Sequence, residues 1–323
     1  MKVLELCAGA GGQALGLDLA GYEKAALVEI DKDACETLRI NRPSWNVIHG
    51  DLKQLKNHNF GSVDLVCGGV PCQPFSIAGQ KLGQHDERDL FPVAVKLVET
   101  HKPIGFFFEN VRGLAGANFD QYRNQIINEL VDLGYHVEWK VLEAADFGVP
   151  QLRPRFIMVG KRNDASPFPW PQPSAKKKTV AESISDLMGA NGWRGLNDWI
   201  PIASQIAPTI VGGSKKHGGP DLGPTRAKRQ WAAMGVDGLG IANEAPSQNF
   251  EGLPRLTNRM VARIQGFPDS WQFAGKKTAT YRQIGNAFPP PVAHAVALAM
   301  KSWLNQSTAK KPKRQATQLD LSL

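Results

Sequence analysis

The chain has 323 residues, of which 42% are hydrophobic, and a formal net charge of +8 with a pI of about 9.3. A chain of this length buries a sizeable core, and we expect two lobes. No apolar run is long enough to cross a bilayer and the first residues show no signal-peptide pattern, so we expect a cytoplasmic protein with no membrane contact. The four cysteines show neither metal-ligand spacing nor a disulfide framework, so we expect no metal. The basic balance suits a polyanionic partner, although this is weak support alone.

The first half of the chain predicts strands that alternate with helices. We expect strands over 2–6, 25–31, 47–52, 63–67, 105–111, 135–143 and 156–160. The helices are expected over 13–20, 33–41, 90–100 and 119–133. This alternation implies a parallel, doubly wound sheet, which binds ligands beyond the carboxyl ends of its strands.

A glycine-rich turn at 7–12 lies between the first strand and its helix. Glycines let the backbone approach a ligand closely, and a helix N-terminus offers free N–H groups, as at a nucleotide site. Gly9, Gly11 and Ala14 also fit the dinucleotide pattern, and a tight turn without a ligand is the alternative. Glu29 follows about 20 residues later, where a carboxylate can accept ribose hydroxyls; a helix-capping or solvated acid is its alternative.

Cys72 follows the apolar run 63–67 and a turn that we predict from Gly68, Gly69 and Pro71. A thiol just beyond a strand end can reach a substrate, and as a thiolate it is a strong nucleophile. The alternative is a small apolar residue that packs a loop, which is how most cysteines behave. The polar segment 77–89 is predicted to be a mobile loop that closes over the site.

Two further groups of charged residues follow strands. Glu109 comes after three phenylalanines, where burying a carboxylate without a partner is costly, and this favours function over a solvated acid. Arg153 and Arg155 flank one proline, so in an extended chain both side chains point the same way. They suit an anion or a polar base edge, and a surface salt-bridge pair is the alternative.

The composition changes from about residue 163, where proline, glycine, tryptophan and lysine rise and periodicity falls. We expect a linker over 167–178 and a region with little core of its own. The basic, glycine-rich loops 212–219 and 226–229 fit a phosphate backbone, with solvated loops as the alternative. Beyond them we expect a helix over 255–266, a turn over 281–288 and an apolar helix over 292–304 that packs on the first lobe.

With these motifs in order, the chain resembles the bacterial DNA (cytosine-5)-methyltransferases of restriction-modification systems. The resemblance covers nearly the whole length outside the basic middle region. It rests on the turn 8–12, Glu29, Asp51, Pro71-Cys72-Gln73, Glu109-Asn110-Val111, Gln151 with Arg153 and Arg155, Gln265-Gly266-Phe267-Pro268, and Gln283-Ile284-Gly285-Asn286. Cys7 departs from the usual aromatic residue of the family, which puts packing on the cofactor adenine in doubt. Met260 stands where a glutamate is common, at a position that we interpret as structural.

The resemblance implies a reaction and a set of catalytic residues. Cys72 would attack carbon 6 of a flipped-out cytosine, and Glu109 would bind its N3 and amino edge. Arg153 and Arg155 would hold the pyrimidine carbonyl and the Cys72 region. Carbon 5 would then take the methyl group of S-adenosylmethionine, after which the carbon 5 proton and Cys72 would leave.

The resemblance also implies the binding residues and the domain limits. For the cofactor we expect Cys7, Ala8, Gly9, Gly11, Gly12, Glu29, Ile30, Asp51, Leu52, Pro71, Leu90, Asn286 and Phe288. For duplex DNA we expect Gln73, Ser76, Lys215, Lys216, Arg226 and Arg229. The fold class is then α/β, with a mostly parallel, doubly wound, Rossmann-like sheet in residues 1–162 plus 278–306. Residues 163–277 would form a smaller, irregular DNA-recognition domain, and 307–323 a disordered tail.

Three other functions compete with this interpretation. A transfer-RNA cytosine methyltransferase of the related family has the same core, although the long basic region favours DNA. A nicotinamide dehydrogenase explains the glycines and Glu29 but not Cys72, Glu109 or the arginines. A catalytically dead DNA-binding protein would be expected to lack Cys72 or Glu109.

Partners follow from the same interpretation. We expect a monomer, because one asymmetric cleft and one flipped base need no second subunit, and a cognate restriction endonuclease that acts on the same DNA site. The last residues, 318–323, carry leucines at alternate positions with an acid between them. They resemble the peptide by which bacterial proteins bind the replication sliding clamp, and a solubilising tail is the alternative.

Overall fold

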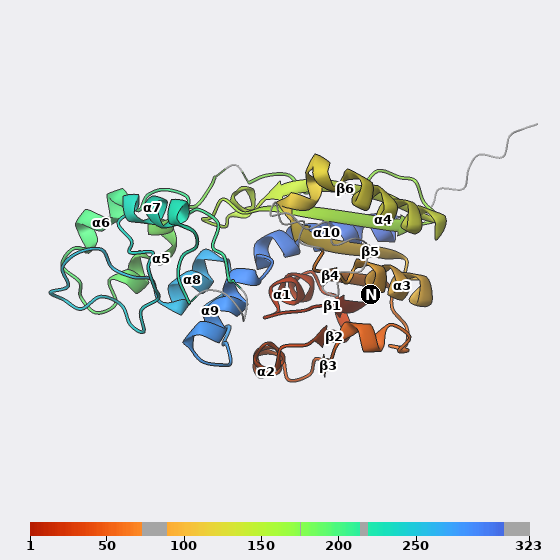
Figure 1. Cartoon of the computed structure of the whole chain (residues 1–323), viewed down its shortest axis with the longest axis horizontal. Coiled ribbons are helices and arrows are strands. Elements are labelled where there is room, and N and C mark those ends of the chain that lie inside the picture. Colours follow the sequence, from red (N-terminus) through yellow and green to blue (C-terminus); the bar gives the residue numbers. More distant parts are fainter. Residues whose placement is uncertain (73–88, 175, 214–218, 307–323) are drawn as a thin grey trace, which may run out of the picture.

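Figure 1 shows the computed structural model, which describes residues 1–72, 89–174, 176–213 and 219–306. Its centre is a seven-stranded sheet of order β3-β2-β1-β4-β5-β7-β6. The strands are β1 (Lys2–Leu6), β2 (Glu23–Glu29), β3 (Val47–His49), β4 (Leu65–Gly69), β5 (Gly105–Val111), β6 (Tyr135–Glu143) and β7 (Pro154–Arg162). The first five strands in this order are parallel, whereas β7 runs antiparallel to both β5 and β6.

Helices cover both faces of the sheet. The buried side chains of β5 alternate between these two faces and pack against the helices on each. Phe107 packs with α1 (Gly12–Leu19) and α10 (Pro290–Asn305), which also contact each other. Phe106 and Phe108 face the opposite way and pack with α3 (Phe91–His101) and α4 (Asp120–Asp132). Helix α2 (Lys32–Asn41) lies beside β3, and the 3-10 segments are η1 (Leu52–Leu55), η2 (Arg112–Ala115), η3 (Ala117–Phe119) and η4 (Ala144–Phe147). The doubly wound α/β class and the return of the last helix are confirmed.

The region after residue 163 lies to one side of the sheet and is built from short helices (Figure 1). They are α5 (Val180–Met188), α6 (Leu196–Ile202), α7 (Thr225–Ala233), α8 (Asn258–Ile264) and α9 (Lys277–Asn286). Contrary to the expectation of little core, Ile184, Trp199 and Trp231 are buried in one large apolar cluster. Leu15 of α1 belongs to the same cluster, so this region is joined to the sheet side by packing. The domain limits stay a prediction.

Two local predictions were wrong. Strand β4 continues through Gly68 and Gly69, which pair in register with Phe108 and Glu109, so the turn begins later. The stretch from Tyr281 is the second half of helix α9 and not a turn. The mostly parallel sheet is confirmed: β7 alone runs against the other six strands, so β6 again has the direction of β5.

Helix α9 was missed because Gly285 near its end reads as a turn residue. Its backbone lies against Gly212, and an added Cβ would be 2.6 Å from the Gly212 Cα. Gly285 is therefore needed for a close approach of two backbones within a helix. Met260 occupies the third position of α8, where its Sδ accepts from the Thr257 N–H at 3.4 Å, which supports the interpretation of this position as structural.

Candidate active site

Two cavities adjoin at the carboxyl ends of β1, β4 and β5, at the switch point of the sheet. We call them the base cavity, of about 490 Å³, and the cofactor cavity, of about 350 Å³. They share Gly69, Pro71, Glu109 and Asn286. A group bound in one is therefore within reach of a group bound in the other.

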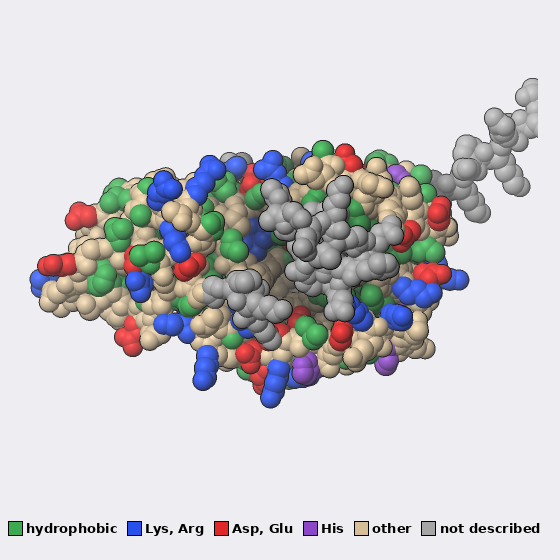
Figure 2. Space-filling view, viewed as in Figure 1, with side chains coloured by type: hydrophobic (Ala, Val, Ile, Leu, Met, Phe, Trp, Pro, Cys, Tyr) green, Lys and Arg blue, Asp and Glu red, His purple; other side chains and the backbone are tan. Residues whose placement is uncertain are grey.

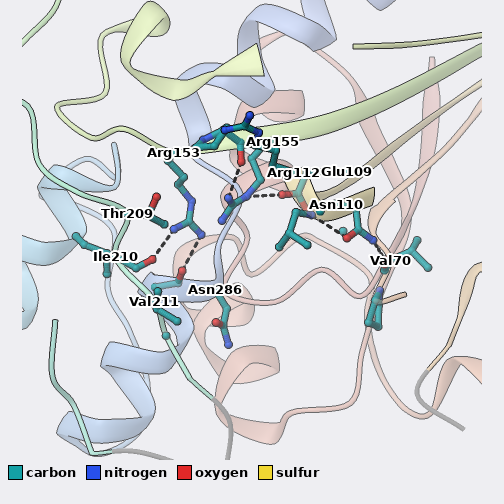
Figure 3. Close-up of a pocket in the computed structure, with 17 residues that line it drawn as sticks. Val70, Glu109, Asn110, Arg112, Arg153, Arg155, Thr209, Ile210, Val211 and Asn286 are labelled. Carbon is teal, nitrogen blue, oxygen red and sulfur yellow. Dashed lines mark hydrogen bonds and ion pairs between the residues drawn. The ribbon is translucent and has the colours of Figure 1, made fainter. Parts of the chain in front are cut away.

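The turn after β4 places Cys72 beside the base cavity. Its thiol Sγ lies 3.4 Å from the Asn110 Oδ1. The Asn110 amide donates to the Val70 carbonyl at 2.7 Å (Figure 3). Asn110 thus connects the end of β5 to the turn that carries the thiol. Burial, with smaller effects of Asp89 and Glu109, raises the pKa of Cys72 to about 11, whereas the Asn110 contact lowers it. The thiol is therefore neutral at pH 7 without its substrate.

Glu109 faces the base cavity from the end of β5, paired with Arg155 of the neighbouring β7. The Arg155 Nε lies 2.8 Å from the Glu109 Oε1, and both side chains are nearly buried (Figure 3). Burial raises the pKa of Glu109, and Arg155 followed by Arg153 opposes that rise. A carboxyl whose pKa is raised by burial holds a proton more readily than a free glutamate, and a protonated carboxyl can donate to a ring nitrogen.

Arg153 lines the base cavity, but its guanidinium donates hydrogen bonds to backbone carbonyl groups. It donates to Ile210 at 2.6 Å, Gly285 at 2.7 Å and Ala287 at 3.1 Å, and it is 1% exposed (Figure 3). Gln151 strengthens the same junction through Gln265 at 2.8 Å. The geometry therefore favours Arg153 as a clamp that joins three segments of the cavity wall over direct contact with a base.

The cofactor cavity is bounded by the glycine-rich turn and by acidic side chains. Glu29 accepts the backbone N–H groups of Gly9 at 2.7 Å, Ile30 at 2.9 Å and Asp31 at 2.7 Å. Burial raises the pKa of Glu29, and these backbone contacts oppose the rise. At Gly12 an added Cβ would lie 2.1 Å from the Phe288 carbonyl oxygen, so a side chain there would collide with this wall.

The lining suits a ligand with cationic and hydroxyl groups. Glu5 and Gln13 line the cofactor cavity, and their buried side-chain oxygens have no hydrogen-bond partner in the described protein. Burial raises the pKa of Glu5 to about 7, with Lys24 opposing. Arg282 is the basic side chain among the described residues that line this cavity, 3.8 Å from Asp31. Acidic side chains suit a sulfonium or ammonium group, the basic Arg282 suits a carboxylate, and Glu29 suits hydroxyl groups. S-adenosylmethionine carries all of these groups.

The expected residues divide into those at the cavities and those elsewhere. The catalytic set Cys72, Glu109, Arg153 and Arg155 gathers at the base cavity. The expected cofactor residues that line their cavity are Cys7, Ala8, Gly9, Gly12, Glu29, Pro71, Asn286 and Phe288. Those not among its lining are Gly11, Ile30, Asp51, Leu52 and Leu90. Ile30 is 64% exposed, and Asp51 caps η1 through the Lys53 N–H at 3.0 Å.

Sequence reasoning missed several lining residues, among them Glu5, Gln13, Arg112 and Arg282. Glu5 lies between two leucines and Gln13 precedes Ala14 and Leu15, so the sequence around them does not indicate that they face a ligand. Arg282 lies inside a stretch that was read as a turn, and Arg112 of the base cavity follows the expected strand directly. The one sign that these residues gave in the sequence was that they lie close to the predicted motifs. The motifs themselves indicated only the residues beside them.

Of the expected DNA contacts, Arg226 and Arg229 are exposed on α7. Gln73, Ser76, Lys215 and Lys216 lie outside the described residues, as do most of the expected loop 77–89 and the tail 307–323. Figure 2 shows basic side chains over the α7 region and along the opposite rim near α2 and α9, with acidic side chains among them.

The described residues bring no three or more His, Cys, Asp or Glu side chains together in a way that could hold a metal ion. In the same part of the chain, no helix combines the length and apolar character that a membrane crossing requires. What the site does contain is a thiol, a buried acid and a cofactor-sized cavity beside them. That set is compatible with an enzyme that holds a substrate beside a nucleophile and a cofactor.

The family model of the C-5 cytosine-specific DNA methylases matches residues 1–302, and the chain belongs to this family. Among its relatives, the Type II methyltransferase M.NaeI of Lentzea aerocolonigenes is 53% identical over 312 residues, covering 94% of this chain and 76% of the relative. The Type II methyltransferase M.NgoMIV of Neisseria gonorrhoeae is 52% identical over 298 residues, covering 91% and 95%. The chain is therefore a DNA (cytosine-5) methyltransferase, as its motifs predicted.

Solved structures share the fold at lower identity. A prophage-encoded DNA modification methyltransferase from E. coli has a TM-score of 0.66 and 23% identity, covering 95% of this chain and all of that one. The Dnmt2 methyltransferase of S. pombe has a TM-score of 0.64 and 18% identity, covering 94% and 99%. At this identity the likeness extends to the fold alone.

Proposed function

We propose that the enzyme methylates carbon 5 of a cytosine that is extruded from a specific short sequence of duplex DNA, with Cys72 as the covalent nucleophile. The observation that carries this is the meeting of Cys72, Glu109 and Arg155 at a cavity that shares its wall with the cofactor cavity. A base inside a duplex presents only its edges, so the ring must leave the stack before a thiol can attack it.

The residues act in a defined order. Cys72 gives its proton to water as its sulfur adds to carbon 6 of the cytosine, and the N3 atom gains the proton that Glu109 holds, so carbon 5 becomes nucleophilic. Arg155 keeps Glu109 oriented through their 2.8 Å contact. After carbon 5 has been methylated, water takes the carbon 5 proton, the electrons of that C–H bond restore the ring double bond, and the Cys72–carbon 6 bond breaks. Cys72 then regains a proton from water, and N3 returns its proton to Glu109.

S-adenosylmethionine supplies the methyl group as an electrophilic carbon on a sulfonium. Glu29 would hold its ribose hydroxyls, and the backbone of the turn 7–12 would lie along its amino-acid part. Glu109 and Pro71 belong to both cavities, which supports transfer between two ligands held side by side.

The biological setting is a further proposal. Relatives named as Type II methyltransferases support a restriction-modification role in which a cognate endonuclease acts on the same site. We propose a monomer, and we keep sliding-clamp binding through residues 318–323 as a separate hypothesis. Calorimetry of purified clamp with the full chain, and with a chain that lacks 318–323, tests the latter; no heat at micromolar concentration contradicts it.

The substrate is tested directly with labelled cofactor. Purified enzyme is given tritiated S-adenosylmethionine with duplex DNA in one reaction and transfer RNA in another, and bisulfite sequencing locates the modified cytosines. We expect transfer to duplex DNA at one short sequence. Transfer to RNA and not to DNA would favour the alternative in which the enzyme modifies transfer RNA.

A further inference from the structure

We propose that Trp271 is a positioning residue for the cofactor, which holds the glycine-rich turn 7–12 in its binding shape from behind. The inference rests on the proposed function, because it takes the cavity behind that turn as the S-adenosylmethionine site. Trp271 is not among the residues that line either cavity. It would act through the turn and not on the ligand.

The contact between the indole and the turn is specific. The Trp271 Nε1 donates to the Ala10 carbonyl at 3.1 Å, and the ring is 1% exposed. The neighbouring Gly11 has a φ of 85° and caps the N-terminus of α1. An added Cβ at Gly11 would lie 2.9 Å from the indole Cζ2. The ring therefore occupies the space that the absent side chain leaves, and the N–H fixes the adjacent carbonyl.

The indole is itself held on several sides. Arg259 donates to the Trp271 carbonyl at 2.7 Å, and the Arg42 guanidinium lies 5.5 Å from the ring centre. The rings of Phe267 and Trp45 lie 6.1 and 6.3 Å away. A side chain fixed in this way can transmit the position of its own segment to the turn.

That segment is connected to the helices beyond residue 163. Arg263 of α8 lies 2.5 Å from Asp186 of α5 and is also paired with Asp269, two residues before Trp271. Ion pairs and one indole thus link α5 to the cofactor turn. The same path gives the proposed DNA-recognition region a physical connection to the cofactor site.

Losing the indole N–H should weaken the cofactor without disturbing the chemistry. In Trp271→Phe the ring packing largely remains, but the Ala10 carbonyl becomes a buried acceptor without its donor. One lost hydrogen bond of this kind corresponds to about a three- to tenfold rise in the Kd for S-adenosylmethionine. At saturating cofactor, kcat should stay within about twofold, because the reacting groups at the base cavity are unchanged.

The matched control is Trp231→Phe. Trp231 is also fully buried, but its indole N–H has no hydrogen-bond partner in the described protein. The experiment measures the Kd for S-adenosylmethionine by calorimetry without DNA for wild type and both variants, beside their thermal midpoints. We expect Trp231→Phe to bind the cofactor as wild type does, and Trp271→Phe to bind it more weakly, with a thermal midpoint that is lower by a few degrees.

The outcomes distinguish a failure of the positioning role of Trp271 from a failure of the proposed function. Equal cofactor affinity in Trp271→Phe and wild type would overturn the positioning role, as would equal weakening in both variants. If wild type binds no S-adenosylmethionine, the proposed function fails instead. Arg263→Gln tests the link: it should weaken cofactor binding in the wild-type background but add nothing to Trp271→Phe, and additive effects would overturn the path through Trp271.

Discussion

The two cavities differ in how their polar walls are satisfied. In the base cavity, Glu109 is paired with Arg155, and the two terminal nitrogens of Arg153 donate to three carbonyls, although its Nε has no partner in the described protein. In the cofactor cavity, the buried oxygens of Glu5 and Gln13 have no partner in the described protein. Unpaired buried polar atoms cost folding free energy, whereas internally paired ones hold a shape. The base cavity is thus held mainly by its own contacts, whereas the cofactor cavity presents acceptors that S-adenosylmethionine would meet.

The largest difference between the two cavities is expected when the nucleophile of the base cavity is removed. We expect Cys72→Ser to abolish turnover, because a hydroxyl is far harder to ionise than a thiol. Cofactor affinity should be largely unchanged, since Cys72 is not among the residues that line that cavity. Radiolabel transfer and calorimetry measure the two quantities, and normal methylation by the variant would rule out the role of Cys72.

The next effect is expected at the acid. Glu109→Gln keeps the side-chain size but removes the proton that the carboxyl would give to the ring, so kcat should fall about 10²- to 10⁴-fold. Single-turnover rates at saturating DNA and cofactor measure this. Glu99→Gln, an exposed change on α3, is the control. A loss below threefold would show that Glu109 has a packing role.

Arg153 should matter more for stability than for binding a base. Arg153→Met leaves three buried carbonyls without their donor, and we expect the free energy of unfolding to fall by about 3 kcal/mol. Urea denaturation measures this loss, with the exposed Arg226→Met as control. If stability is unchanged and only DNA methylation suffers, Arg153 contacts the substrate and the clamp interpretation is wrong.

An effect of comparable size is expected when the pH is changed, because of Glu5 in the cofactor cavity. Burial raises the pKa of Glu5 from 4.5 in the unfolded chain to about 7, so between these pH values the folded state retains a proton that the unfolded state has lost. Stability from this group should therefore fall as pH rises from 4.5 to 7, by up to about 3 kcal/mol. Glu5→Gln should flatten that dependence in urea denaturation at pH 5 and pH 7.5. Parallel profiles for the two proteins would show that Glu5 is not the source.

The sequence predicted the base cavity better than its surroundings for physical reasons. Cys72 and Glu109 each follow an apolar run that only a buried strand explains, so their place at the sheet edge could be predicted. The reversed pairing of β7 could not, because a period of two is the same in parallel and antiparallel strands.

Long-range contacts were also beyond the sequence patterns. Arg153 was predicted at the site, but its backbone carbonyl acceptors lie 57 to 134 residues away in the chain, and no local pattern encodes them. The helices α5 to α7 were missed because they are short and break the periodicity quickly. The Trp271–Ala10 contact, 261 residues apart in the sequence, depends on the completed fold.

The most direct test of the account is a covalent trap at Cys72. The enzyme is incubated with S-adenosylmethionine and a methylatable duplex that carries 5-fluorocytosine, since fluorine blocks the final loss from carbon 5. Peptide mapping by mass spectrometry then locates the DNA adduct. We predict one cross-linked peptide, joined through Cys72, and none in Cys72→Ser. An adduct at another residue, or methylation of ordinary DNA without any trapped species, would contradict the account.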